Sequence, residues 1–267
     1  MKKRLILILN GKGGVGKSFF AVNLVQYLKD RQIAHAAFDS DDENSTLKRF
    51  HPEAEFINVN DPQEIDNMVR ALSETNVVAV DCRAASTRIF LDYFKEMRLS
   101  EVVEDMDARL TIACPVNHEM DGIYQIQKLA TTVGDGADFL IIRNEVHGEG
   151  FELFDKSKAR QKLMNELGAK EIVVHKMHKW LVEGLQKNKM TVTAAKTDKE
   201  FSIMDRQRLI VWQREFYEQL DSVKELLLPG NTEPAKADSR ATQVSPLAVI
   251  SRASIKQAGD VGQHGAR

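Results

Sequence analysis

An α/β fold, with a doubly wound and mostly parallel sheet and helices on both faces, is predicted by the 267-residue sequence. Six short apolar runs rich in β-branched residues recur along the chain, and stretches with a helical spacing of apolar residues separate them. This alternation is typical of βαβ units. The runs are apolar at nearly every position, which indicates strands buried on both faces.

The predicted strands follow the apolar runs, at residues 5–9, 33–38, 77–80, 110–114, 139–142 and 171–174. The predicted crossover helices lie between them, at residues 19–31, 61–73, 87–97, 119–133 and 156–167. A last helix is predicted over residues 205–228, because apolar side chains repeat there every three or four positions. We expect residues 1–228 to form one domain. Residues 229–267 are poor in aromatic residues and rich in Ala, Ser and Gly, which predicts a disordered tail.

Composition limits the class of protein. Hydrophobic residues make up 43% of the chain and charged residues 28%, as in globular proteins. No apolar run approaches the roughly 18 residues of a membrane span, and the run ending at Leu9 is too short for a secretion signal. We therefore expect a cytoplasmic protein, with peripheral attachment to a membrane as the less favoured alternative. Cys82 and Cys114 lack metal-ligand spacing, which favours two buried thiols over a zinc or iron–sulfur site.

Charge is distributed unevenly along the chain. Residues 39–107 carry 17 acidic and 7 basic side chains, whereas residues 156–215 carry 14 basic and 7 acidic ones. The basic segment is a candidate surface for non-specific DNA binding, and so for association with the nucleoid. Lysine and arginine that only solvate helices are the alternative interpretation.

Residues 11–18, which we call the phosphate loop, follow the first predicted strand directly and precede a predicted helix. Glycines allow close approach to phosphates, backbone N–H groups and the helix N-terminus attract the anion, Lys17 reaches the β- and γ-phosphates, and Ser18 ligates Mg²⁺. A chance match in a glycine-rich turn is the alternative, but the strand–loop–helix context disfavours it. The pattern predicts binding of ATP and Mg²⁺ by Gly11, Lys12, Gly13, Gly14, Val15, Gly16, Lys17, Ser18 and Phe19.

Polar side chains follow three other predicted strands. Ligands of open α/β sheets bind beyond the carboxyl ends of strands, so Asp39 and Asp41, Asp81, and Asn144 are candidate site residues. Asp81 after a buried strand fits a Walker B carboxylate, which holds Mg²⁺ or its waters. An ordinary cap at the strand end is the alternative.

The stretch KGGVGKS resembles the deviant Walker A motif of the ParA/MinD family of P-loop NTPases. The resemblance implies that Lys12 reaches across a dimer interface to phosphate bound by the other subunit; a solvated lysine is the alternative. The stretch FDSDDENSTLKRF resembles the switch region of the same family, with Asp39 and Asp41 on its two aspartates. That likeness implies that Asp41 positions the attacking water, so Lys12, Lys17 and Asp41 are the predicted catalytic residues.

Further roles are implied by the same resemblance. Magnesium would be held by a set of polar residues at the ends of strands and of the phosphate loop: Ser18, Asp39, Asp41 and Asp81. Asn144 matches a strand-end asparagine linked to adenine recognition, although asparagine is also a common turn residue. The chain departs from the family where Asp42 and Glu43 replace a common proline and glutamine, and where DCRAAST follows the Walker B strand. Because of these departures, the resemblance does not fix the rate of ATP hydrolysis or the coupling of hydrolysis to the switch region.

The complete set of motifs looks like the StbB/TraL-like proteins of plasmid stability and conjugation. What this resemblance implies is an ATPase that dimerises with ATP and acts in plasmid stability, DNA partition or positioning, or conjugative transfer. Its implied partners are a second copy and a DNA-binding adaptor protein. A small-molecule kinase or an ATP-dependent ligase is the alternative. A nitrogenase-reductase-like electron carrier would need cluster-ligating cysteines, and Cys82 and Cys114 alone argue against it.

Overall fold

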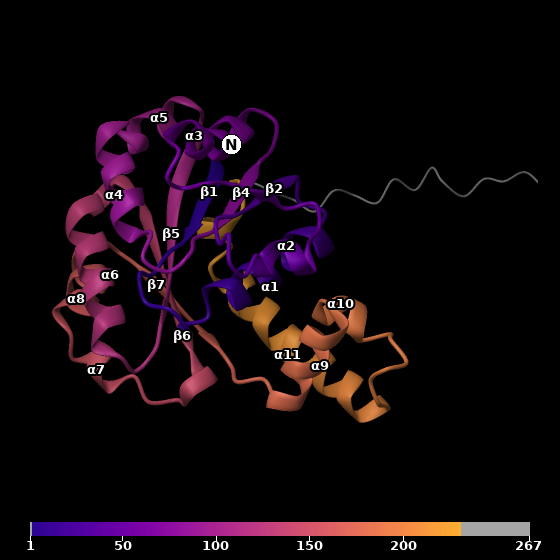
Figure 1. Ribbon diagram of the computed structural model, residues 1–267. Coiled ribbons are helices and arrows are strands. Elements are labelled where there is room, and N and C mark those ends of the chain that lie inside the picture. Colours follow the sequence, from indigo (N-terminus) through magenta and orange to yellow (C-terminus); the bar gives the residue numbers. More distant parts are fainter. Residues whose placement is uncertain (1, 231–267) are drawn as a thin grey trace, which may run out of the picture. The chain divides into compact units, whose positions relative to one another are not determined.

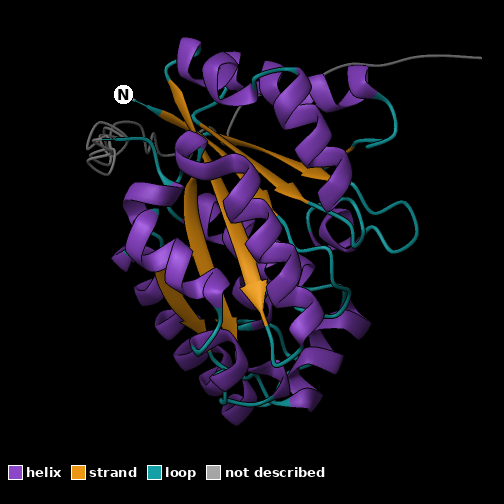
Figure 2. Ribbon diagram, turned by 90° about the vertical axis from the view of Figure 1, so that its left-hand side faces the viewer, coloured by secondary structure: helices purple, strands orange, loops and turns teal. Residues whose placement is uncertain are grey.

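Seven parallel strands form one sheet in the order β3-β2-β4-β1-β5-β6-β7. The computed structural model describes residues 2–230, and Figures 1 and 2 show its strands running in one direction between helices. The strands are β1 (Lys3–Ile8), β2 (His35–Asp39), β3 (Glu55–Phe56), β4 (Val77–Asp81), β5 (Ala108–Val116), β6 (Asp138–Asn144) and β7 (Lys170–Val174). The predicted tail beyond Gly230 lies outside the described residues.

All six predicted strands are confirmed, with β1, β2 and β4 to β7 in their places. The strand β3 was not predicted, because it has only two residues and both are exposed. Alternation along β1 explains why helices cover both faces of the sheet. Leu5, Leu7 and Leu9 point into one hydrophobic core, and Ile6 and Ile8 point into the other.

Each face of the sheet is covered by its own set of helices. One core packs beneath α1 (Lys17–Asp30), α2 (Thr46–Phe50), α9 (Lys179–Asn188), α10 (Val192–Ala195), α11 (Ile203–Ser222) and α12 (Lys224–Leu227). The other core packs beneath α3 (Pro62–Arg70), α4 (Thr87–Glu96), α5 (Leu99–Asp105), α6 (Met120–Val133), α7 (Glu152–Asp155) and α8 (Lys158–Gln161). In Figure 1, α1, α9, α10 and α11 lie to the right of the strands, and α4, α6, α7 and α8 lie to the left. None of the helices within residues 2–230 has both the length and the apolar character to cross a bilayer.

Two predicted helices differ from the observed ones. The single helix predicted over residues 205–228 is interrupted at Val223, whose φ of −126° and ψ of 23° are not helical. The break lets α12 turn against the sheet, where Thr111 Oγ1 donates a hydrogen bond to Leu226 O (2.6 Å). The helix predicted over 156–167 consists of α8 followed by a π-helical turn over Lys162–Glu166.

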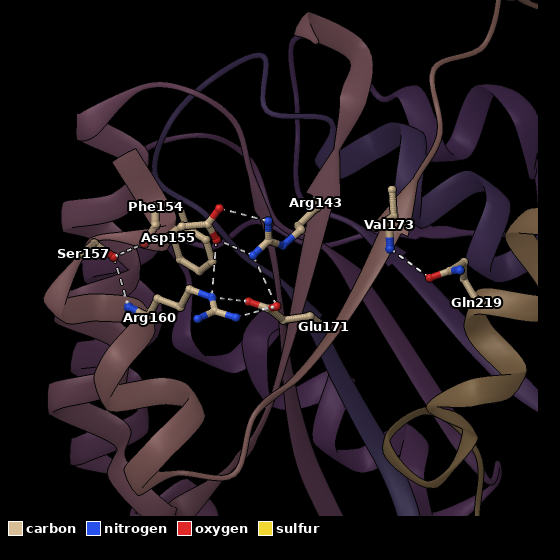
Figure 3. A network of polar contacts seen from close by, with 8 residues as sticks. All are labelled: Arg143, Phe154, Asp155, Ser157, Arg160, Glu171, Val173 and Gln219. Atoms are coloured by element: carbon tan, nitrogen blue, oxygen red, sulfur yellow. Dashed lines mark hydrogen bonds and ion pairs between the residues drawn. The ribbon is translucent and has the colours of Figure 1, made fainter. Parts of the chain in front are cut away.

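Side chains of neighbouring helices and of β6 contact β7, the last strand of the sheet (Figure 3). Val173 N donates to Gln219 Oε1 of α11 (3.0 Å). Glu171 accepts two hydrogen bonds from Arg160 (2.9 and 3.1 Å) and one from Arg143 (3.3 Å). Because Arg143 lies on β6 and Arg160 on α8, these ion pairs fix the last two strands to the helical layer beside them.

The register of the central strands brings three loops together. Ile8 and Asp39 both lie opposite Asp81 in their parallel pairings. The chain leaves β1, β2 and β4 just after these residues, so the phosphate loop and the segments after Asp39 and Asp81 meet at one edge of the sheet. This edge carries the candidate site.

Candidate nucleotide-binding site

The phosphate loop connects β1 to α1 with two glycines in left-handed conformations. Gly14 has a φ of +77° and Gly16 a φ of +97°, a region that favours glycine. At Gly16 a Cβ would also lie only 1.9 Å from Nδ2 of Asn144. Gly16 is the N-cap of α1, and Lys17 is the first residue of that 14-residue helix. The N-cap glycine makes no side-chain hydrogen bond, and the first backbone N–H groups of a helix lack intrahelical acceptors, so this helix start is suited to bind an anion.

Lys17 lies buried beneath the loop, where its Nζ donates a hydrogen bond to Lys12 O (2.9 Å). Burial lowers the pKa of this amine, and the nearby Asp81 carboxylate acts in the opposite direction. The amine is thus held inside the loop by a backbone carbonyl and an adjacent negative charge. A phosphate group at this position would give the ammonium ion a stronger partner.

Asp81 is the buried carboxylate of the site. It ends β4, and neither of its carboxylate oxygens has a hydrogen-bond partner among residues 2–230. Burial raises the pKa of Asp81 to about 7, while the hydroxyl of Ser18 acts in the opposite direction. A buried carboxylate beside a hydroxyl fits Mg²⁺, which binds one or two side chains and completes its shell with phosphate oxygens and water. Within the described range, no three or more His, Cys, Asp or Glu are arranged as a metal-binding cluster, and the joint binding of Mg²⁺ by Asp39, Asp41 and Asp81 stays a prediction.

Asp39 is equally buried, but its carboxylate is fully engaged by the segment that follows it. We call residues 40–45 the acidic loop. Asp39 Oδ1 accepts from Asp41 N (3.0 Å), and Oδ2 accepts from Lys48 N in α2 (3.2 Å). Burial raises the pKa of Asp39, and these two N–H groups counteract the rise. In this structure Asp39 therefore organises the acidic loop; its predicted role as a magnesium ligand stays a prediction.

Asp41 shapes the next turn of the acidic loop. Its Oδ1 accepts from the backbone N–H groups of Glu43 and Asn44 (both 3.1 Å), and its backbone O accepts from Ser45 N (3.0 Å) and Ser45 Oγ (2.9 Å). The side chain is only partly buried. These contacts fix the carboxylate near the start of the acidic loop, on the same edge of the sheet as the phosphate loop.

Ser40 and Arg83 connect the acidic loop to the segment after β4, and the sequence had singled out neither of them. Ser40 Oγ donates to Asp81 O (3.1 Å) and accepts from Arg83 N (2.9 Å). The Arg83 guanidinium pairs with Asp42 at 3.1 Å. Asp42 and Arg83 belong to the two segments that depart from the family pattern, so these departures meet each other in space. Ala85 N donates to Gly11 O (3.1 Å), which adds the phosphate loop to the same network.

Asn144 braces the phosphate loop from the end of β6. Its Nδ2 donates to Val15 O (2.9 Å), and its Oδ1 accepts from Val146 N (3.2 Å). Both polar ends of this buried side chain are thus engaged within the protein, and adenine recognition by Asn144 stays a prediction. Phe19 lies on the first turn of α1 and packs edge-to-face on Trp212, with ring centroids 5.5 Å apart.

Lys12 projects from the exposed side of the phosphate loop. Its Nζ lies 2.7 Å from Glu119 Oε2 and 3.7 Å from Asp121 Oδ2, at the start of α6. Nothing in the sequence indicated the ion pair between Lys12 and Glu119, although Glu119 lies shortly after the predicted strand at 110–114. Elsewhere, the predicted burial of the two thiols is confirmed, since Cys82 and Cys114 are buried and free.

Residues 6–205 match the family described as the CobQ/CobB/MinD/ParA nucleotide binding domain, and the chain therefore belongs to this family. The predicted relation to ParA and MinD is confirmed, and so is the α/β fold of P-loop NTPases.

Two relatives match the chain over most of its length. Protein MobD of Acidithiobacillus ferrooxidans is 24% identical over 230 residues, which cover 84% of this chain and 99% of MobD. A Protein TraL of Escherichia coli is 24% identical over 235 residues, which cover 82% of this chain and 98% of TraL.

Among solved structures, the MinD cell division protein of Aquifex aeolicus is similar with a TM-score of 0.48 and 16% identity, covering 80% of this chain and 97% of that one. The septum site-determining protein MinD complexed with Mg-ADP, from Pyrococcus horikoshii OT3, has a TM-score of 0.49 and 13% identity, covering 84% of this chain and 99% of that one.

Proposed function

We propose that this protein is an ATPase that works as an ATP-dependent dimerisation switch, with a slow hydrolysis step that partners accelerate. Two copies bind ATP and Mg²⁺ between them, and hydrolysis separates the copies. The observation that carries the proposal is the place of Lys12. It lies beside the exposed Gly13 and Gly14 on the outer side of the phosphate loop, whereas Lys17 occupies the inner side.

Lys17 and Ser18 would bind the phosphates and the metal from the loop, and Asp81 would hold the metal or its water from β4. When bound, Mg²⁺ supplies the positive charge that neutralises the phosphate oxygens. The support for this assignment is the pair of unpartnered oxygens on Asp81. Asp41, fixed by two backbone N–H groups, would orient the attacking water. Phosphoryl transfer depends on such positioning and needs no covalent help from the protein.

The switch would act on plasmid DNA, in stability, partition or positioning, or conjugative transfer, with a DNA-binding adaptor as partner. The similarity to TraL proteins and the motif resemblance described above support this cargo. Direct, non-specific DNA contact would use the basic segment 156–215. Several of its basic residues are already paired with carboxylates, including Arg160, Lys162 and Lys179. Exposed lysines around α9 remain as the best candidates for phosphate contacts: Lys176, Lys187 and Lys189.

The central experiment measures the oligomeric state of the full chain by analytical ultracentrifugation with ATP and Mg²⁺ and with ADP. We expect a dimer only with ATP, and a monomer for Lys12→Ala in both nucleotides. Lys95→Ala, an exposed lysine on α4, is the matched control and should dimerise normally. The proposal fails when Lys12→Ala and the natural protein show the same monomer–dimer equilibrium. ATP turnover that requires an added metabolite would instead identify a small-molecule kinase.

The DNA contact is tested separately, by titrating the ATP-bound protein into a fluorescent duplex at several salt concentrations. We expect affinity to fall steeply with salt, and the slope to shrink by about one for each phosphate-contacting lysine removed from the set Lys176, Lys187 and Lys189. Binding that ignores salt, or that the triple alanine variant retains in full, would overturn this part of the proposal.

A further inference from the structure

The pairing of Lys12 with α6 joins the phosphate loop to a distant part of the chain. Glu119 is the N-cap residue of α6, and Asp121 lies in its first turn. The Lys12 ammonium approaches both carboxylates, and the contact with Glu119 is the closer one. Negative side chains at a helix N-terminus already stabilise the helix through its dipole. The pairing with Lys12 is an additional contact, and helix formation alone does not require it.

Both partners of this ion pair are held in position by asparagines. On the α6 side, Asn117 Oδ1 accepts from Glu119 N (3.1 Å) and Asn117 Nδ2 donates to Glu119 Oε1 (3.3 Å). One carboxylate oxygen of Glu119 is thus anchored, and the other receives Lys12. On the loop side, Asn10 Oδ1 accepts from Lys12 N (3.0 Å), while Asn10 Nδ2 donates to Pro115 O of β5 (2.7 Å).

The pair is accessible and can be exchanged for a stronger one. The side chain of Lys12 is 33% exposed and that of Glu119 is 52% exposed, so water screens their attraction. Such exposed pairs are weak compared with contacts to a multiply charged phosphate in a desolvated interface. The Lys12 ammonium can therefore pair with Glu119 of its own subunit, and it can exchange this partner for a phosphate when a nucleotide bound to another copy comes within reach.

We propose that Glu119, assisted by Asp121, is a positioning residue that holds Lys12 against its own subunit and so sets how readily two ATP-loaded copies associate. This inference rests on the proposed dimerisation switch. In the monomer the Lys12 ammonium is paired within the chain. In the dimer the same ammonium contacts the phosphates of the other copy, and the Glu119 carboxylate remains with Asn117.

The test compares the dimer dissociation constants of the natural protein and of Glu119→Gln, with ATP and Mg²⁺, in the full chain. Glutamine keeps a hydrogen-bond acceptor for Asn117 and removes the charge that holds Lys12. We expect dimerisation to become tighter by about three- to thirty-fold, since each dimer releases two such pairs. Asp121→Asn should give a smaller gain. Glu166→Gln, which breaks the exposed pair with Lys162 at 3.0 Å, is the matched control and should change nothing.

A purely structural role would lower the melting temperature of Glu119→Gln and leave the ATP-dependent association constant unimproved. An unchanged dissociation constant overturns the holding role. A weaker dimer, as for Lys12→Ala, also overturns it, because Glu119 would then act within the dimer. If Lys12→Ala itself associates like the natural protein, the dimerisation switch fails and the role of Glu119 falls with it. An unchanged Glu119→Gln beside an impaired Lys12→Ala defeats the role of Glu119 alone. The two failures are therefore distinguishable.

A second measurement needs no dimer. The pKa of Lys12 is raised chiefly by its hydrogen bond and charge pairing with Glu119. Titration of the Lys12 side-chain ¹³Cε signal in the nucleotide-free protein should therefore show a lower pKa in Glu119→Gln than in the natural protein. Equal values in the two proteins would show that the pair does not form in solution, and the inference would fall.

Discussion

Asp39 and Asp81 lie opposite each other at the ends of two neighbouring strands, and both are buried. The protein treats the two carboxylates differently. The oxygens of Asp39 accept hydrogen bonds from the backbone N–H groups of Asp41 and Lys48. The oxygens of Asp81 have no such partner within residues 2–230. Burying an ionised carboxylate is costly unless hydrogen bonds or an opposite charge compensate it.

The difference separates a structural carboxylate from one that is ready to bind a cation. For Asp39, the backbone N–H groups of Asp41 and Lys48 compensate the cost of burying the carboxylate, and the same hydrogen bonds fix the acidic loop. Among the described residues Asp81 has no backbone N–H partner of this kind, and burial raises its pKa to about 7, although the Ser18 hydroxyl and the Lys17 amine act in the opposite direction. An external cation beside Ser18 would supply what the chain does not. Asp39 and Asp81 thus share their register and their burial but differ in role, because they differ in their hydrogen-bond partners.

The largest effect that would test this contrast is in the pH dependence of stability. The folded protein binds a proton on Asp81 more tightly than the unfolded chain does, since its pKa is raised from 3.8 to about 7. Protonation therefore stabilises the fold, and this stabilisation is lost as the pH rises from about 4 through about 7. Urea unfolding without nucleotide should show a loss of up to roughly 4 kcal/mol relative to Asp81→Asn over that range. If the difference in unfolding free energy between the two proteins did not change with pH, the proposed contrast between Asp81 and Asp39 would be wrong.

The next effect concerns catalysis. Asp81→Asn should lower magnesium-dependent ATP turnover by at least about a hundred-fold, because the neutral amide holds the metal poorly. Release of inorganic phosphate at several Mg²⁺ concentrations measures this loss. Asp92→Asn, which changes an exposed carboxylate on α4 paired with Arg88, is the control and should turn over ATP normally. Natural turnover in Asp81→Asn would mean that the metal is held elsewhere.

A smaller effect should appear in stability at Asp39. Replacement by alanine removes the acceptors for the N–H groups of Asp41 and Lys48, so Asp39→Ala should lose about 2–3 kcal/mol of unfolding free energy at pH 7. Asp81→Ala, at the paired position, should lose none or gain stability without nucleotide. Urea denaturation of both variants makes the comparison. Equal losses of unfolding free energy in the two variants would show that the two carboxylates stabilise the fold to the same extent.

The smallest effect extends the contrast to the phosphate loop. Asn144→Ala removes the donor to Val15 O, and we expect a loss of about 1 kcal/mol in unfolding free energy together with weaker ATP binding. Thermal unfolding and isothermal titration calorimetry measure the two quantities. The control is Asn67→Ala, at an exposed position of α3, which should leave both quantities unchanged. If ATP affinity falls sharply while stability is unaltered, Asn144 contacts the nucleotide itself, as its resemblance to the family asparagine implies.

The sheet and the phosphate loop were predictable because their signals are local. Apolar runs identify β1 and β4, and the spacing of Gly11, Lys17 and Ser18 identifies a phosphate cradle. Strand ends also identified Asp39 and Asp81 as polar residues near that cradle. Their different environments were not predictable, because the partner of Asp39 on α2 depends on how the acidic loop turns back.

Contacts between distant segments were hidden for the same reason. Lys12 and Glu119 are neighbours only because β1 and β5 pair in parallel, and nothing near either residue indicates the other. Asp42 and Arg83 likewise meet through the pairing of β2 with β4. The helix break at Val223 was also missed, since the apolar stripe of α11 continues into α12 without interruption. Tertiary packing of Leu226 and Leu227 against the sheet overrides that pattern.

The outer strands of the sheet have a consequence for how copies of this chain can meet. Exposed strand edges are templates for strand addition, which leads to aggregation and fibril growth. Here one outer strand, β3, offers two residues, and on the other the N–H of Val173 already donates to Gln219. Growth of the sheet from chain to chain is therefore opposed at both ends. The proposed ATP-dependent association would therefore use loops and helices in place of the strand edges.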